Sequence, residues 1–172
     1  TVTIWAGREV IRIEPGYVES LYGLAVDVGS TTVAAHLCDL RTGAVLATEA
    51  MMNPQVRYGE DLMSRVSYGM NEANGMQRMH HSILRALDQL AERAAEVAGI
   101  QPSEITDVVL VGNTVMHHLL LGIDPVHIGA APFALATEDA VDLRMREFGL
   151  KTVHHGAMIP LLPCIAGYVG AD

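Results

Sequence analysis

Asp27-Val-Gly-Ser-Thr-Thr32 is the stretch that decides how this chain folds. It ends the apolar run 21–28, and a second apolar run, 33–40, follows at once. We therefore predict two strands joined by a tight turn, with a carboxylate at the end of the first. Such a turn directs backbone N–H groups and three hydroxyls toward one point, which suits a polyphosphate, and Mg²⁺ prefers oxygen ligands. An ordinary hairpin turn with Gly and Ser fits the local pattern equally well.

Composition limits the classes of protein to which the chain can belong. Half of its 172 residues are apolar, enough for one good core and one main domain. The formal net charge of −9 and the scattered Lys and Arg argue against a nucleic-acid partner. No apolar run is long enough to span a bilayer, so no membrane partner is expected. Cys38 and Cys164 have no CxxC spacing, which favours a reducing cytoplasm.

The order of predicted elements indicates an α/β fold. Strands joined by very short turns form an antiparallel meander, and helices alternate with strands after it. The predicted strands are 21–28, 32–40, 44–51, 107–111 and 158–162, and the predicted helices are 60–68, 76–97 and 115–121. Residues 135–148 are expected to be extended and then briefly helical. This order, β-β-β-α-β-α-β, predicts a mixed sheet with helices on its faces.

A second polar loop, Gly112-Asn113-Thr114, follows the predicted strand 107–111. Ligands of open α/β sheets bind at the carboxyl ends of strands, so this loop and Asp27–Thr32 are expected at one edge. Asn113 or Thr114 could instead cap the following helix, and both roles can hold together.

The segment 53–65, NPQVRYGEDLMSR, is strongly polar. We prefer a functional loop that contacts a ligand or partner. Alternatively, Glu60 and Asp61 favour a helix N-terminus, and Arg57 and Arg65 pair with these acids. Elsewhere, three adjacent histidine pairs lack the i,i+4 spacing that places two metal ligands on one helix face, so no zinc site is expected.

Four segments resemble a known family. DVGSTTVAAHLCDLRTG resembles the first phosphate loop of the actin, sugar-kinase and Hsp70-type ATPase superfamily, whose ribonuclease H-like half-domain also begins with a meander. More specifically, the chain resembles the ATP-dependent reductive activators of corrinoid proteins. The segments that carry this resemblance are LYGLAVDVGSTTVAAHLCDLRTG, NPQVRYGEDLMSR, VVLVGNTVMHHLLLGI and IPLLPCIAGYVGAD.

The resemblance implies that residues 20–172 are the N-terminal lobe of an actin-like ATPase domain, truncated before the second lobe. Residues 1–19 would be the trailing hairpin of a preceding middle domain. The intact protein would couple ATP to the reduction of a Co(II) corrinoid, with an electron from a [2Fe-2S] domain that this chain lacks. A corrinoid protein would be its partner, and a homodimer stays open. Alone, this fragment is expected to be inactive.

The resemblance also implies roles for individual residues. Asp27 would order Mg²⁺ through water, Asp172 would place a second acid near the metal, and Glu60 or Asp61 would orient a water in catalysis. The residues expected to contact ATP are Gly29, Ser30, Thr31, Thr32, Gly112, Asn113 and Thr114. Alternative functions are another ATPase of the superfamily, such as a small-molecule kinase or dehydratase activator, and a nucleotide-controlled partner-binding module.

Overall fold

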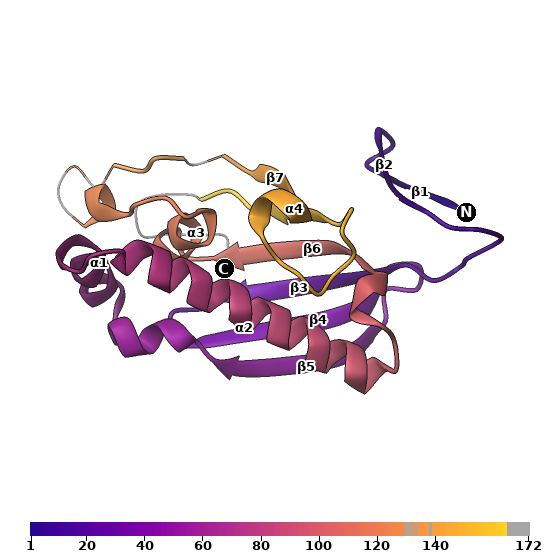
Figure 1. Cartoon of the computed structure of the whole chain (residues 1–172), viewed down its shortest axis with the longest axis horizontal. Helices are drawn as coiled ribbons and strands as arrows, with labels where there is room; N and C mark the ends of the chain where they lie inside the picture. The colour runs from indigo at the N-terminus through magenta and orange to yellow at the C-terminus, as the bar shows by residue number, and fades with distance from the viewer. Residues whose placement is uncertain (130–131, 133, 138, 165–172) are drawn as a thin grey trace.

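A six-stranded sheet organises the molecule, in the order β5-β4-β3-β6-β8-β7 (Figure 1). The computed structural model of the chain describes residues 1–129, 132, 134–137 and 139–164. The strands of this sheet are β3 (Tyr22–Val28), β4 (Thr32–Asp39), β5 (Val45–Met52), β6 (Ile105–Gly112), β7 (Val141–Arg144) and β8 (Met158–Leu161). The pairs β3–β4, β4–β5 and β7–β8 are antiparallel, whereas β3–β6 and β6–β8 are parallel.

The helices connect and cover the strands. They are η1 (Pro54–Tyr58), α1 (Leu62–Asn71), α2 (Gly75–Ala98), η2 (Pro102–Glu104), α3 (Thr114–Leu121), η3 (Val126–Ile128) and α4 (Met145–Phe148). The predicted mixed sheet, a meander followed by αβαβ, is confirmed. The short elements β7 and α4 form the extended and helical segment expected over 135–148.

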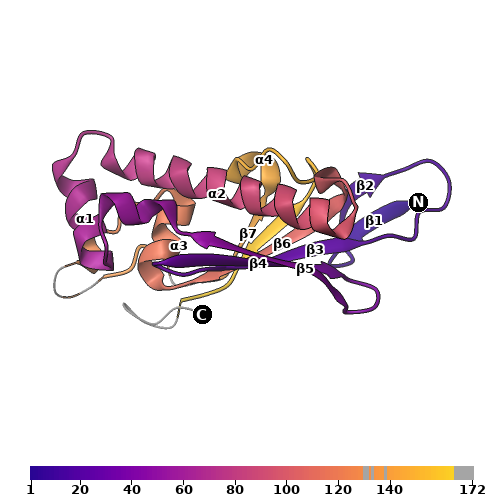
Figure 2. The same ribbon diagram turned by 90° about the horizontal axis from the view of Figure 1, so that it is seen from below.

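The core lies between α2 and one face of the sheet, as Figure 2 shows edge-on. Alternate residues of each strand point to the same face, and those of β3 and β4 that face α2 are buried apolar side chains. Helix α2 packs on this face through a stripe of buried apolar residues at helical spacing, which includes Met79, Ile83, Leu87 and Leu90. Gly99 ends α2 at φ 71°, and its N–H bonds the carbonyls of Ala95 and Glu96.

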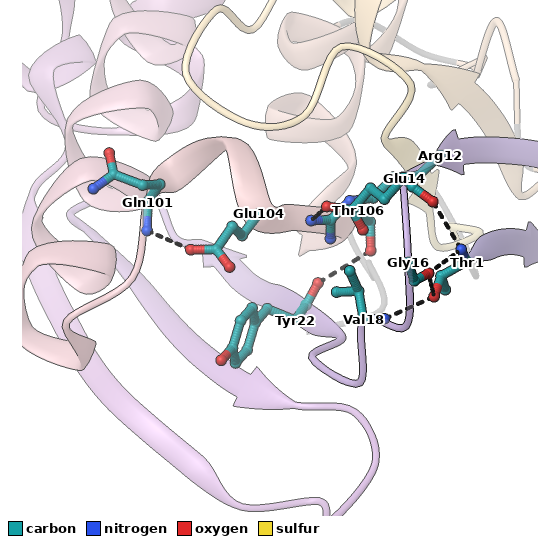
Figure 3. Close-up of polar contacts among 9 residues, drawn as sticks. All are labelled: Thr1, Arg12, Glu14, Gly16, Val18, Tyr22, Gln101, Glu104 and Thr106. Carbon is teal, nitrogen blue, oxygen red and sulfur yellow. Dashed lines mark hydrogen bonds and ion pairs between the residues drawn. The ribbon is translucent and has the colours of Figure 1, made fainter.

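The first residues form a separate two-stranded antiparallel sheet of β1 (Val2–Trp5) and β2 (Glu9–Ile13). The segment after β2 is hydrogen-bonded to Thr1. The backbone nitrogen of Thr1 donates to the carbonyls of Glu14 and Gly16 at 2.8 and 2.6 Å (Figure 3). That residues 1–19 belong to a preceding domain stays a prediction. None of the helices in the described ranges combines the length and the apolar character needed to cross a bilayer.

Candidate phosphate-binding site

The two polar loops predicted at one edge of the sheet lie side by side. In the parallel pairing of β3 with β6, Val28 stands opposite Gly112, so the loops after these residues leave from adjacent positions (Figure 1). A Cβ on Gly112 would lie 3.0 Å from the carbonyl oxygen of Val28, which shows how closely the two backbones approach. The sheet therefore brings Asp27–Thr32 and Gly112–Thr114 together at its edge, as the sequence predicted.

Asp27 is exposed near the end of β3. Its neighbours Val26 and Val28 are 2% and 0% exposed in the core beneath α2, so the carboxylate projects from the opposite face of the sheet. Its partners in register, Ala34 and Val111, carry small side chains. An acid at this position is accessible from solvent and lies two residues before the turn.

The Gly29–Thr32 loop is compact and needs glycine at its start. A Cβ on Gly29 would lie 2.6 Å from the backbone oxygen of Thr32, a contact that a neighbouring main chain cannot relieve. Thr31 and Thr32 are exposed and Ser30 is half-buried. The loop thus presents hydroxyl-bearing residues at its surface with a minimum of covering side chains.

Polar side chains from the segment after β5 hold this loop from the interior. Asn53 and Arg65 are both 0% exposed. The Asn53 side-chain amide donates to the Gly29 carbonyl at 2.8 Å, and its backbone N–H donates to the Thr31 carbonyl at 2.8 Å. Arg65 donates through one Nη to the Ser30 carbonyl and through Nε to the Gly59 carbonyl at 2.9 Å.

The 53–65 segment, which the sequence predicts to contact a ligand or partner, turns part of its polar side chains to the interior, and contact through its exposed residues stays a prediction. Gln55 is also 0% exposed and donates to the carbonyl of Met79 at 3.2 Å. Arg57 is exposed and donates to the hydroxyl of Tyr58 at 2.6 Å, over whose ring its guanidinium lies. The sequence shows that the segment is unusually polar, but only the structure shows that Asn53 and Arg65 bond the Gly29–Thr32 loop.

The start of α3 confirms the capping alternative for Asn113. Its side-chain oxygen accepts the backbone N–H of Met116 at 3.0 Å, and its backbone is extended, as at an N-cap. Thr114 follows as the first residue of α3 and is 1% exposed. The α3 N-terminus thus adjoins the Gly29–Thr32 loop, and contact of Gly112–Thr114 with a nucleotide stays a prediction.

Asp61 is the N-cap of α1, so the alternative role of the acids at a helix N-terminus is confirmed for Asp61. Its carboxylate accepts the backbone N–H of Ser64 at 2.7 Å, and the Ser64 hydroxyl side chain bonds the Asp61 backbone N–H in a capping box. The hydrogen bond from the Ser64 backbone lowers the pKa of Asp61. Glu60 is exposed beside it, and a catalytic role for either acid stays a prediction.

The metal prediction rests on two positions, of which the structure describes one. Asp172, the second predicted acid, lies outside the described residues. Within the part of the chain that is described, no three His, Cys, Asp or Glu side chains gather closely enough to hold a metal by themselves. Binding of Mg²⁺ at Asp27 and Asp172 stays a prediction.

Comparison with known proteins relates the chain to corrinoid activators. The family model described as "RACo middle region" matches residues 22–172. The corrinoid activation enzyme RamQ of Eubacterium limosum is 30% identical over 171 residues, which are 98% of this chain and 29% of that protein. The solved structure of a reductive activator for corrinoid, iron-sulfur protein matches 99% of this chain and 27% of that protein's chain, with a TM-score of 0.91 and 31% identity. This match confirms the ribonuclease H-like, actin-like half-domain that the resemblance predicts. The chain therefore spans less than a third of the relatives that it matches.

Proposed function

This chain belongs to the RACo middle region family, and from that premise we propose that it is the ATP-binding lobe of a corrinoid activator. Its relatives, a corrinoid activation enzyme and a reductive activator for corrinoid, iron-sulfur protein, support this role. In the complete protein, ATP would drive the reduction of a Co(II) corrinoid on a partner protein, with electrons from a [2Fe-2S] domain outside this chain. The protein would act in the cytoplasm, with residues 20–172 as the first lobe and residues 1–19 as the end of a preceding domain.

The observation that carries the proposal is the meeting of two Gly-containing loops beside an exposed carboxylate. Gly29 and Gly112 let the backbone pack closely on the carbonyl oxygens of Thr32 and Val28, which brings the main-chain donors of the two loops close together. The donor set fits a magnesium-bound polyphosphate, because hydroxyls and N–H groups bind phosphate oxygens and a carboxylate holds hydrated Mg²⁺. The metal would supply charge neutralisation during phosphoryl transfer.

The residues present would divide these tasks as follows. Gly29–Thr32 would hold the β- and γ-phosphates, and Gly112–Thr114 would border them. Asp27 would order Mg²⁺ through water, with Asp172 as a second acid near the metal. Glu60 and Asp61 would be candidates for orienting a water, although Asp61 already caps α1.

Replacing Asp27 tests this function in the complete activator. Asp27→Ala is expected to weaken Mg·ATP binding roughly 10- to 100-fold, the usual effect of losing a residue that supports a metal site, and to abolish ATP-dependent corrinoid reduction. Titration calorimetry measures the first effect, and the optical spectrum of the corrinoid partner measures the second. Because Asp27 is exposed, the melting temperature should change little.

Glu96→Ala, the removal of an exposed acid from α2, is the matched control and should retain both activities. Near-normal Mg·ATP binding by the folded Asp27→Ala protein would refute the assignment of Asp27. Failure of the unmodified protein to bind Mg·ATP at all would refute the proposed function itself.

A further inference from the structure

We propose that Arg65 is a positioning residue for ATP phosphates, acting from inside the fold with Asn53 through the Gly29–Thr32 loop. This inference rests on the proposed function, because the loop is taken to hold phosphates. Neither side chain would touch the nucleotide, since both are 0% exposed. They would act by orienting the loop and by placing a positive charge behind it.

The orientation follows from three consecutive carbonyls that are all bonded on their interior side. Gly29 and Thr31 accept from the side-chain amide and backbone N–H of Asn53, both at 2.8 Å, and Ser30 accepts from the Arg65 guanidinium. In a trans peptide the C=O of one residue and the N–H of the next point in opposite directions. The N–H groups of Ser30 and Thr31 must therefore point away from Asn53 and Arg65, toward the side on which an anion would bind.

The charge of Arg65 is the second part of the argument. None of the ion pairs found in the described ranges includes Arg65, so its buried guanidinium is satisfied by carbonyls rather than by a carboxylate. Burial lowers the pKa of Arg65, which Asp61 offsets in part, yet a guanidinium keeps its proton in proteins. A buried charge that no carboxylate bonds directly is costly, and an anion bound across the loop would reduce that cost.

Met116 joins this support to the second loop. Its sulfur lies 3.5 Å from an Nη of Arg65 and 3.6 Å from the side-chain amide nitrogen of Asn53. The backbone N–H of the same residue bonds the side chain of Asn113. One buried cluster thus underlies both the Gly29–Thr32 loop and the start of α3, so a change at Arg65 would reach both sides of the site.

The local chain is built to place arginine at this position. The Asp61–Ser64 capping box fixes the first turn of α1, and Arg65 follows it directly. A Cβ on Gly59 would lie 2.7 Å from the backbone nitrogen of Arg65, so glycine is needed for the segment before α1 to pack against the first turn of that helix. From there Nε reaches the Gly59 carbonyl while Nη reaches Ser30, a fork that the single ammonium of lysine cannot reproduce.

The test compares nucleotides that differ in the phosphates the loop would hold. In the complete activator, Arg65→Gln should weaken Mg·ATP binding roughly 10- to 100-fold, the range for a lost charge-assisted hydrogen bond. AMP, which lacks the β- and γ-phosphates, should displace a fluorescent nucleotide as it does from the unmodified protein. Arg65→Lys keeps the positive charge but cannot bond both carbonyls, so its affinity for Mg·ATP should lie between those of the unmodified protein and Arg65→Gln. Arg93→Gln, an exposed arginine on α2, is the matched control and should behave as the unmodified protein.

Each outcome decides the inference. Selective loss of Mg·ATP affinity with partial rescue by lysine supports it, whereas unchanged Mg·ATP affinity, or equal losses for Mg·ATP and AMP, overturns it and leaves the proposed function standing. If Arg65→Gln does not fold by circular dichroism, Asn53→Ala decides by the same comparison. This variant removes the side-chain donor to Gly29 and the cap on the Gln55 N–H, but it keeps the backbone N–H that bonds Thr31. Absence of Mg·ATP binding by the unmodified protein overturns both proposals.

Discussion

His117 is a buried titratable residue whose surroundings make it sensitive to acid. It is 1% exposed in α3, and neither ring nitrogen has a hydrogen-bond partner within the described residues. Burial, and next the neighbouring His118, lower the pKa of His117 from 6.5 to about 4. The folded protein therefore holds His117 neutral at pH values where the unfolded chain binds a proton.

This residue predicts a pH dependence of stability. Between pH 6.5 and about 4 the unfolded state binds more protons at His117 than the folded state does, so stability should fall as pH falls through this window. Urea midpoints at pH 7 and pH 5 measure the loss. His117→Leu should reduce it, although not abolish it, because burial also lowers the pKa values of His118 and His154.

The control for this prediction is His127→Leu, which replaces an exposed histidine in η3 and should leave the acid sensitivity unchanged. An equal loss of stability on acidification in the His117→Leu protein would contradict the argument. The sequence showed three adjacent histidine pairs and excluded a helical metal pair by spacing. It could not show that one member would be buried without partners, because burial depends on what packs against α3.

Helix α2 is the element on which the core depends. Leu87 is 1% exposed at the middle of its apolar stripe, among the core residues that face the meander. Leu87→Ala is expected to lower the free energy of unfolding by about 2–5 kcal/mol. The folded state loses the hydrophobic transfer energy of the removed atoms and also contains the cavity that they leave. Chemical denaturation measures the change, and Glu92→Ala on the exposed face of the helix should remain within about 0.5 kcal/mol. A similar effect at both positions would show that α2 does not anchor the core.

The elements that were predictable are those with a strong local pattern. The alternation in β3 and β4 and the helical spacing in α2 depend on neighbouring residues, and the structure reproduces them within one residue at most ends. The predicted helix 60–68 begins later, at Leu62, because Asp61 caps it and Gly59 lies against its first turn. The short strand β7 depends on its partner β8 and could be expected only as an extended segment.

At the scale of the whole molecule, a few contacts dock the β1–β2 hairpin on the lobe. Glu9 pairs with Arg144 at 2.7 Å, and Arg8 pairs with Asp142 at 3.3 Å. A Cβ on Gly156 would lie 2.1 Å from the carbonyl oxygen of Ile11, so the hairpin backbone rests directly on the loop before β8. These contacts set the position of the hairpin, which pairs with no strand of the six-stranded sheet.

Charge reversal tests this docking. Arg144→Glu should speed hydrogen exchange of the β2 amides by about twofold to fivefold, consistent with the small free energy of partly exposed ion pairs. Combining it with Glu9→Arg should restore the original rates, and Arg93→Glu on α2 should not change them. If the double variant exchanges as fast as the single one, the pair does not position the hairpin. Exchange in α2 reports whether the lobe itself remains intact.

The meander, the long amphipathic helix and the Asp27–Thr32 turn were all accessible from the sequence, because each depends on patterns within a few residues. The hydrogen bonds that Asn53 and Arg65 make to that turn were not accessible from the sequence. Asn53 lies 24 residues from Gly29, and Arg65 lies 35 residues from Ser30, so their hydrogen bonds exist only after β5 and α1 bring them beneath the loop. A polar side chain in a sequence has no defined partner. The folded path of the chain alone decided that these two would be buried, bonded to consecutive carbonyls and directed away from solvent.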